Sequence, residues 1–222
     1  MRFSFLLLGL LCSQFIIAQR AILDSGGSLS PEQAAYDVSF YDLTLSIDPE
    51  EKSIEGCLKV EATVVHPTFW LVLDLDTLLQ VEKVESNNLI VPYRREIGQL
   101  WISLERQMQA GESINATIHY KGKPRVAPNP PWNGGFSWEK TKSGAHWIAT
   151  SCQTQGADLW WPCKDHVSDE PDSMNLHIEV PSDLVVASNG TLRQVEKKKS
   201  TSVYHWHIAN PINIYNVALN IA

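Results

Sequence analysis

The sequence has little positive charge for a protein of its size. Its 222 residues include 18 Lys and Arg against 25 Asp and Glu, which gives a formal net charge of −7. The one lysine cluster, residues 197–199, lies near the turn residues Asn189 and Gly190 and indicates a solvated hairpin tip. Because nucleic-acid binding normally requires a basic patch, we expect no nucleic-acid partner.

The sequence also lacks every catalytic signature that would identify an enzyme directly. None of the seven histidines is followed by glutamate, so the His-Glu-x-x-His zinc motif is missing. No nucleophile elbow, phosphate-binding loop or dinucleotide fingerprint occurs either. A cysteine zinc site is disfavoured because the chain contains no Cys-x-x-Cys pair. The residues alone therefore identify no catalytic residue and no metal ligand set.

Cysteine is scarce, and its number is informative. Apart from Cys12 in the leader, the chain has Cys57, Cys152 and Cys163, an odd number for an exported protein. Two interpretations follow. Either Cys152 and Cys163 close a disulfide and Cys57 stays a thiol, or all three are small core residues.

Long apolar runs are confined to the first residues. Residues 1–18 have one positive charge, an apolar run and the small residue Ala18, the pattern of a signal peptide cleaved after Ala18. Ser13 and Gln14 interrupt the run, which is short for a membrane span. We therefore expect a secreted or periplasmic protein whose mature chain does not span a membrane. Residues 19–35 are polar, with glycine and proline, and predict a flexible leading segment.

From Tyr36 onward, apolar and polar residues alternate with a period of two, which predicts β-strands. Turn residues separate the runs, and no ten-residue helical pattern is present. The pattern predicts an all-β, mostly antiparallel sandwich or barrel over residues 36–222. The predicted strands cover residues 36–47, 54–64, 69–75, 79–84, 89–91, 100–104, 114–120, 146–150, 176–180, 184–187, 203–208 and 214–222. Asn189-Gly190 predicts a hairpin that joins the strand at 184–187 to the strand at 203–208.

Five of the eight tryptophans fall between residues 132 and 172. Such crowding predicts either a packed aromatic wall or a binding surface, because tryptophan is large and its N–H requires a partner when buried. The five residues are Trp132, Trp138, Trp147, Trp160 and Trp161.

Two groups of titratable residues have competing interpretations. The acids Asp165, Asp169, Glu170 and Asp172 could form a catalytic dyad or calcium ligands, but their spacing does not match the calcium loop. A structural turn around Pro171 is the favoured interpretation. His205 and His207 share one face of a predicted strand and could bind a metal, although no third ligand is identifiable.

Gln153 is the most notable single residue, because its amide offers both a donor and an acceptor between a predicted strand and Trp160-Trp161. From the residues alone, an amide that satisfies nearby backbone is the simpler interpretation.

Residues 147–174, WIATSCQTQGADLWWPCKDHVSDEPDSM, resemble the N-terminal domain of the aminopeptidase N family of zinc metallopeptidases. This is peptidase family M1, which includes leukotriene hydrolase. The order of the flanking strands agrees over roughly residues 36–222, and the segment at 131–136 is similar to exported bacterial members. One departure is the added length of His166, Val167 and Ser168 before the Asp-Glu-Pro-Asp turn.

The resemblance implies an antiparallel β-sandwich with a saddle-like shape, a function for the chain and a role for one residue. In the family, a Gln or Glu at the position of Gln153 helps to hold the free amino terminus of a peptide substrate. The family's Gly-x-Met-Glu-Asn loop and zinc helix lie downstream of residue 222. We therefore expect no zinc in this chain, a zinc-bearing catalytic domain as its partner, and no peptidase activity from the chain alone. The alternatives are a free-standing β-sandwich that binds ligands through a tryptophan surface, and a truncated inactive product.

Overall fold

The computed structural model describes residues 27–96 and 98–222. The predicted signal peptide and residues 19–26 of the predicted leading segment lie outside these ranges. The end of the leading segment is packed: Gln33–Ala35 form a short 3-10 helix, η1, in which Gln33 and Ala35 are buried. Gln33 donates a hydrogen bond to Asp74 at 2.8 Å. Regular structure thus begins a few residues before Tyr36.

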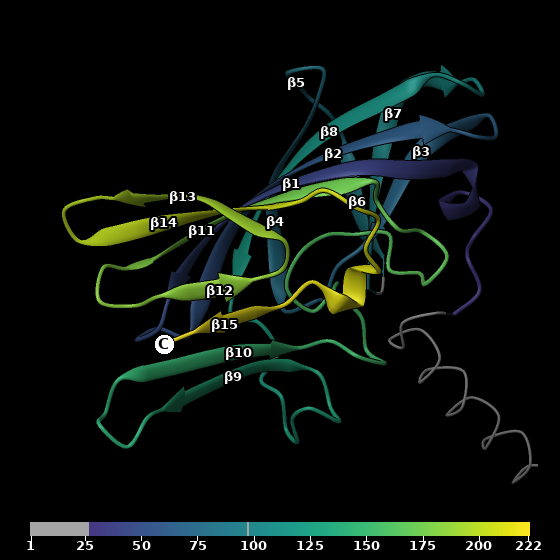
Figure 1. Ribbon diagram of the computed structural model, residues 1–222. Helices are drawn as coiled ribbons and strands as arrows, with labels where there is room; N and C mark the ends of the chain where they lie inside the picture. The colour runs from purple at the N-terminus through teal and green to yellow at the C-terminus, as the bar shows by residue number, and fades with distance from the viewer. Residues whose placement is uncertain (1–26, 97) are drawn as a thin grey trace, which may run out of the picture.

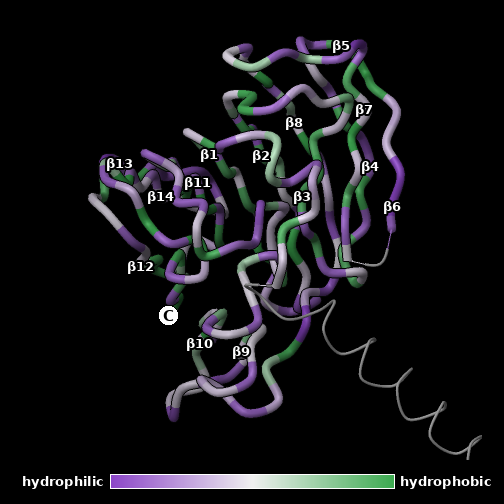
Figure 2. Tube along the Cα trace, turned by 90° about the vertical axis from the view of Figure 1, so that its right-hand side faces the viewer, coloured by the Kyte–Doolittle hydropathy of each residue, from purple (hydrophilic) through white to green (hydrophobic). Residues whose placement is uncertain are grey.

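Within the described residues, the chain forms three β-sheets and two short 3-10 helices, so the predicted all-β fold is confirmed. The four-stranded sheet lies beneath the large sheet, and the three-stranded sheet lies near β2, β4 and β8 (Figures 1 and 2). The eight-stranded sheet has the order β13 (Thr191–Lys197), β14 (Thr201–Ile208), β11 (Ser173–Pro181), β1 (Tyr36–Asp48), β2 (Ser53–Val64), β8 (Ser113–Gly122), β4 (Leu79–Ser86) and β5 (Leu89–Ile90). The four-stranded sheet has the order β12 (Val186–Ser188), β15 (Leu219–Ile221), β10 (His146–Ser151) and β9 (Gly135–Lys140), and the three-stranded sheet the order β3 (Thr68–Asp74), β7 (Gln99–Met108) and β6 (Tyr93–Glu96).

The period of two places alternate residues of β1 on opposite faces, as expected for a half-buried strand. Tyr41, Leu43 and Leu45 have no exposed surface, whereas Asp42 and Thr44 point to the other face. The alternation of hydrophobic and hydrophilic residues is visible along the strands in Figure 2. The large sheet therefore has one face in the core and one polar outer face.

One strand pair departs from the antiparallel pattern. β1 and β11 run parallel, with Tyr41 opposite Met174 and Leu45 opposite Ile178, while the other paired strands are antiparallel. Parallel neighbours need a long connection, and here the connection includes the whole three-stranded sheet and the strands β9 and β10 of the four-stranded sheet. β11 thus lies between β1 and β14 although it comes late in the sequence.

The predicted hairpin at Asn189-Gly190 is wrong. The strand before it, β12, pairs with β15 in the four-stranded sheet, whereas the strand after it, β13, pairs with β14 in the large sheet. Asn189 Oδ1 accepts a hydrogen bond from the backbone of Ala218 at 2.8 Å, and Gly190 has a φ of 83°. The chain therefore passes from one sheet to another at the Asn-Gly turn. Local turn chemistry does not specify which strands pair on either side of the turn.

The final apolar run is also not one continuous strand. Ile214–Asn216 form the 3-10 helix η2, capped by Asn213, and only Leu219–Ile221 pair as β15. Local propensity at residues 214–222 is overridden by the packing of Ile214 into the core.

Candidate functional site

A tight turn follows β10 and carries Gln153. The carbonyl of Cys152 accepts hydrogen bonds from the backbone N–H groups of Gln155 at 3.1 Å and Gly156 at 2.8 Å. Thr154 has a positive φ of 71°, uncommon for a residue with a side chain. The turn therefore presents Gln153 and Thr154 at its tip, and both are exposed.

The two glutamines of this turn have different environments. Gln155 Oε1 accepts a hydrogen bond from the backbone of Gly134 at 2.7 Å, so this amide satisfies nearby backbone. Gln153 makes no hydrogen bond to any part of the chain that the structure describes. The structural role that the sequence suggested for Gln153 thus belongs to Gln155, and the amide of Gln153 is available to another molecule.

The loop before β9 lies beside this turn. Gly135 pairs with Ser151, so the segments that lead to Trp132 and to Gln153 leave the same end of the β9–β10 ladder. The carbonyl of Asn129 accepts from the N–H groups of Trp132 and Asn133, each at 2.9 Å. Trp132 is 75% exposed. Gln153 is therefore flanked by a hydrogen-bonded loop rather than by open coil.

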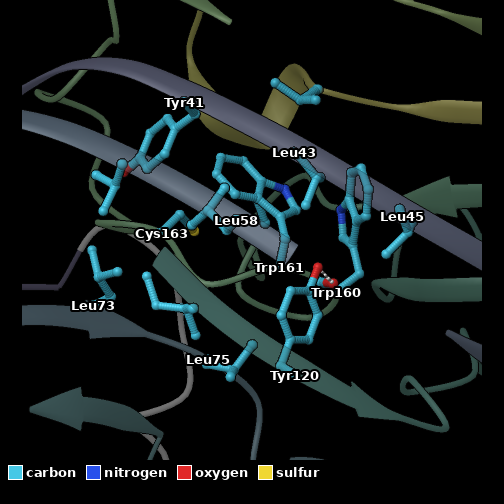
Figure 3. Close-up of a cluster of buried hydrophobic side chains, with 14 of the residues drawn as sticks. Tyr41, Leu43, Leu45, Leu58, Leu73, Leu75, Tyr120, Trp160, Trp161 and Cys163 are labelled. Atoms are coloured by element: carbon cyan, nitrogen blue, oxygen red, sulfur yellow. Dashed lines mark hydrogen bonds between the residues drawn. The ribbon is translucent and has the colours of Figure 1, made fainter. Parts of the chain in front are cut away.

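The central tryptophans form part of the core. Trp160 and Trp161 are 1% and 0% exposed, and Trp161 packs edge-on against Tyr41 with ring centroids 4.9 Å apart. The hydroxyl of Tyr120 donates to the carbonyl of Trp160 at 3.0 Å (Figure 3). Since these two rings do not reach the surface, they cannot contribute to a ligand-binding tryptophan surface. Their burial instead holds the turn that carries Gln153 against the large sheet.

A buried ion pair fixes the corner after Trp161. Lys164 is 5% exposed, and its Nζ lies 3.2 Å from Asp169 Oδ1 and donates to the carbonyl of Tyr36 at 2.7 Å. Burial raises the pKa of Asp169 to about 6, and the charge of Lys164 opposes this effect. Asp169 thus joins the Asp-Glu-Pro-Asp turn to the start of β1, as the structural interpretation requires.

The four acids predicted from the sequence do not converge. Asp165 Oδ1 accepts from the backbone of Ala157 at 3.2 Å, Asp169 pairs with Lys164, and Glu170 and Asp172 are exposed. This arrangement gives neither a catalytic dyad nor a calcium site.

Sequence reasoning missed a different group of acids, contributed by segments far apart in the chain. Asp74 Oδ2 accepts from the backbone of Asp165 at 2.9 Å, and burial raises the pKa of Asp74 to about 6. Burial and the charge of Asp165 raise the pKa of Asp158 well above its usual value. Asp76 forms an ion pair with Arg125 at 2.8 Å. The sequence feature that could have identified this group is the pair of acids inside the apolar run Leu-Val-Leu-Asp-Leu-Asp at residues 71–76.

The three described cysteines are thiols. Cys152 and Cys163 are buried in the core as free thiols, so the predicted disulfide between them does not form. Cys57 is half-buried, so the core-residue interpretation holds for Cys152 and Cys163 but not for Cys57. Burial raises the pKa of the Cys152 thiol to about 12. A thiol that stays protonated is a poor nucleophile, and we assign these cysteines no catalytic role.

The predicted His205–His207 metal pair is not brought together. His207 Nδ1 lies 2.8 Å from Asn175 Oδ1, whereas His205 Nδ1 lies 2.6 Å from Nδ1 of His177. Across residues 27–96 and 98–222, no group of three or more His, Cys, Asp or Glu side chains could hold a metal ion. The same residues contain no helix that is long and apolar enough to cross a membrane.

Fold and site together define a three-sheet β domain that displays the exposed amide of Gln153 at the tip of a hydrogen-bonded turn. A family model described as "Peptidase M1 N-terminal domain" matches residues 38–215. The chain therefore belongs to that family, and the resemblance noted in the sequence is confirmed. No sequence among the curated proteins matches the chain.

Solved structures with the same fold are M1 zinc metallopeptidases. The enzyme from Deinococcus radiodurans superposes with a TM-score of 0.77 at 23% identity, over 91% of this chain and 45% of that chain. A mutant of that enzyme bound to a Tyr-Ser-Ala substrate gives a TM-score of 0.76 at 22% identity, again over 91% and 45%. At this identity the likeness establishes the fold alone. The chain spans less than half the length of these structures.

Proposed function

We propose that this chain is the N-terminal domain of an exported zinc aminopeptidase, and that Gln153 contacts the free amino terminus of the peptide substrate. The observation that carries the proposal is the amide of Gln153, exposed at the tip of a hydrogen-bonded turn and without a partner among the described residues. Membership of the M1 N-terminal domain family supports it.

The chemistry of an amide suits this role. Its oxygen accepts a hydrogen bond from a substrate ammonium group, although more weakly than a carboxylate would. The turn is fixed on both sides, by the Gln155–Gly134 hydrogen bond and by the buried Trp160 and Trp161. Such preorganisation reduces the entropy lost when the substrate binds.

The described residues do not fit a catalytic zinc, because no three suitable ligands lie together. In this proposal the zinc belongs to a downstream catalytic domain, where such an ion lowers the pKa of a bound water. The present chain would cover the cleft of that domain and hold the substrate's amino terminus.

The proposal is tested in the longest polypeptide that the gene encodes, with aminoacyl and peptide substrates. We expect Gln153→Ala to lower kcat/KM about 10- to 100-fold, the effect of losing one hydrogen bond to a charged group. Gln153→Glu should retain activity, since a carboxylate binds ammonium at least as well. Gln80→Ala, which removes an exposed glutamine from β4, is the matched control and should leave kcat/KM unchanged.

An unchanged kcat/KM for Gln153→Ala would refute the role of Gln153. The free-standing binding module and the truncated product make a different prediction, namely that no His-Glu-x-x-His helix follows residue 222 in the same reading frame. A stop codon directly after Ala222 would contradict the proposed aminopeptidase for this product.

A further inference from the structure

The outer face of the eight-stranded sheet carries histidines that the proposed function does not use. This face lies opposite the buried side of Leu43 and Leu45. The strand register places four residues in one row across it, namely Thr44 in β1, His177 in β11, His205 in β14 and Gln194 in β13. The four strands lie next to each other in the upper layer of Figure 1.

His177 and His205 face each other through the same ring atom. Their Nδ1 atoms are hydrogen-bonded to each other at 2.6 Å, one donating and the other accepting, and their ring centroids are 4.8 Å apart. A metal ion between the rings would replace the proton that the two nitrogens share. The side chains are 26% and 24% exposed, so solvent reaches the pair although the sheet holds it in place. β11 and β14 pair directly at these two residues, which fixes the distance between their backbones.

A carboxylate lies behind each ring. Asp42 Oδ1 is 3.3 Å from Nε2 of His177, and Glu196 Oε2 is 3.9 Å from Nε2 of His205. Histidines that bind metals commonly donate their second ring N–H to a carboxylate, which fixes the tautomer and directs the other nitrogen to the metal. In both rings Nε2 faces an acid and Nδ1 faces the other ring, but only Asp42 lies within hydrogen-bond distance of its histidine, since Glu196 is 3.9 Å from Nε2 of His205.

We propose that His177 and His205 form a binding site for a divalent transition metal of the copper or nickel type, held by the two Nδ1 atoms and completed by water. Imidazole nitrogen is a good ligand for these ions, and Cu²⁺ binds most strongly in the first-row series. Two nitrogens on one metal, each at about 2.0 Å, lie roughly 3 Å apart, so the rings need to separate only slightly. The proposal departs from the expectation that the chain holds no metal.

The described residues supply two protein ligands here rather than three, which is why no larger ligand group is found. Two imidazoles plus water predict exchangeable binding and not a permanent structural ion. Glu196 is half-exposed, and its side chain can move with the ring of His205.

Two other histidines on the same face serve as internal controls. His207 is the neighbour of His205 two residues along β14, and its Nδ1 already lies 2.8 Å from Asn175 Oδ1. His119, in β8, has its Nε2 3.2 Å from Glu85 Oε2 and 3.9 Å from Cys57 Sγ. Among the described residues, no second imidazole faces it. Neither offers two convergent ring nitrogens.

The experiment uses the untagged chain without its signal peptide and titrates it with Cu²⁺, and then Ni²⁺, by calorimetry at neutral pH. We expect one Cu²⁺ site per chain. His177→Gln and His205→Gln should each weaken binding at least tenfold, while His207→Gln and His119→Gln should not. Asp42→Asn keeps both ligands and should weaken binding by about tenfold, the usual effect of removing a carboxylate behind a metal-bound histidine.

Far-UV circular dichroism and thermal unfolding check that each variant is folded. A measurement without mutation is the broadening of histidine side-chain NMR signals by substoichiometric Cu²⁺, which should affect His177 and His205 first. Absence of Cu²⁺ binding would overturn the site, as would unchanged affinity in His177→Gln or first broadening at His119 or His207. These outcomes do not depend on peptidase activity.

Discussion

At the scale of single residues, burial determines the chemistry of most acids near the candidate site. Asp74 is surrounded by apolar segments, and three hydrogen-bond donors do not offset the cost of burying its charge. Burial is the largest cause of its raised pKa of about 6, and the N–H of Asp165, Gln99 and Gln33 oppose it. The group therefore favours folding while it is protonated.

This predicts a pH-dependent stability. An aspartate in an unfolded chain has a pKa of about 3.9, so between pH 4 and pH 6 the folded state binds the additional proton. The stabilising contribution of Asp74 is present below about pH 4 and is lost as the pH rises through about 6. Wild type should lose on the order of 1–3 kcal/mol relative to Asp74→Asn between pH 4 and pH 7, measured by urea unfolding.

Asp172→Asn is the control for that experiment, because Asp172 is an exposed aspartate. Its stability should follow that of wild type across the pH range. If the unfolding free energies of wild type and Asp74→Asn changed in parallel with pH, the inferred cost of burying the charge of Asp74 would be contradicted.

At the scale of elements, the turn that carries Gln153 depends on one glycine. Gly156 has a φ of 94°, and a Cβ there would lie 2.6 Å from Asp158 Oδ1 and closer still to Asp165 Oδ2. Both the backbone conformation and the space therefore require glycine. The turn is fixed by its fit against the acids as well as by its own hydrogen bonds.

A comparison of two glycines separates these effects. Gly111 has a similar φ of 87°, but a Cβ there would meet nothing within 4 Å. We expect Gly111→Ala to cost about 1 kcal/mol of unfolding free energy from backbone strain. Gly156→Ala should cost roughly 2 kcal/mol more, because two carboxylates must move. Equal losses of unfolding free energy for Gly111→Ala and Gly156→Ala, measured by urea unfolding, would show that the two carboxylates move at no energetic cost.

At the scale of the whole molecule, the domain has the fold of an M1 N-terminal domain. We expect the chain alone to have no peptidase activity. If the purified chain hydrolysed an aminoacyl substrate and a metal chelator abolished that hydrolysis, the assignment of catalysis to a downstream domain would be contradicted.

Export is a separate prediction for the whole molecule. In its native host, or in a bacterial host, the protein should be recovered outside the cytoplasm with an N-terminus at Gln19, because the leader pattern predicts cleavage after Ala18. Mass spectrometry of the intact protein measures this. A variant in which Leu6, Leu7 and Leu8 are changed to Asp is the control and should stay unprocessed. An unprocessed wild-type chain in the cytoplasm would refute export.

Much of the fold was predictable from the sequence, because alternation with a period of two specifies strands and their buried faces. The expected strands at residues 36–47, 54–64 and 114–120 correspond to β1, β2 and β8. Polar edge strands were missed: β13 and β6 are largely exposed, so no alternation marks them. The motif at residues 147–174 identified the family because a strand that leads to Gln153, an aromatic-Pro-Cys step and an Asp-Glu-Pro-Asp turn follow one another there.

The sequence by itself thus determined most of the strands that have a buried face, and the family. Only the tertiary structure decided that β11 inserts parallel to β1, that Gln155 rather than Gln153 binds the neighbouring loop, and that His177 faces His205. Periodicity tells which face of a strand a residue occupies. It does not tell which strand lies beside it, because that pairing depends on packing between segments far apart in the chain.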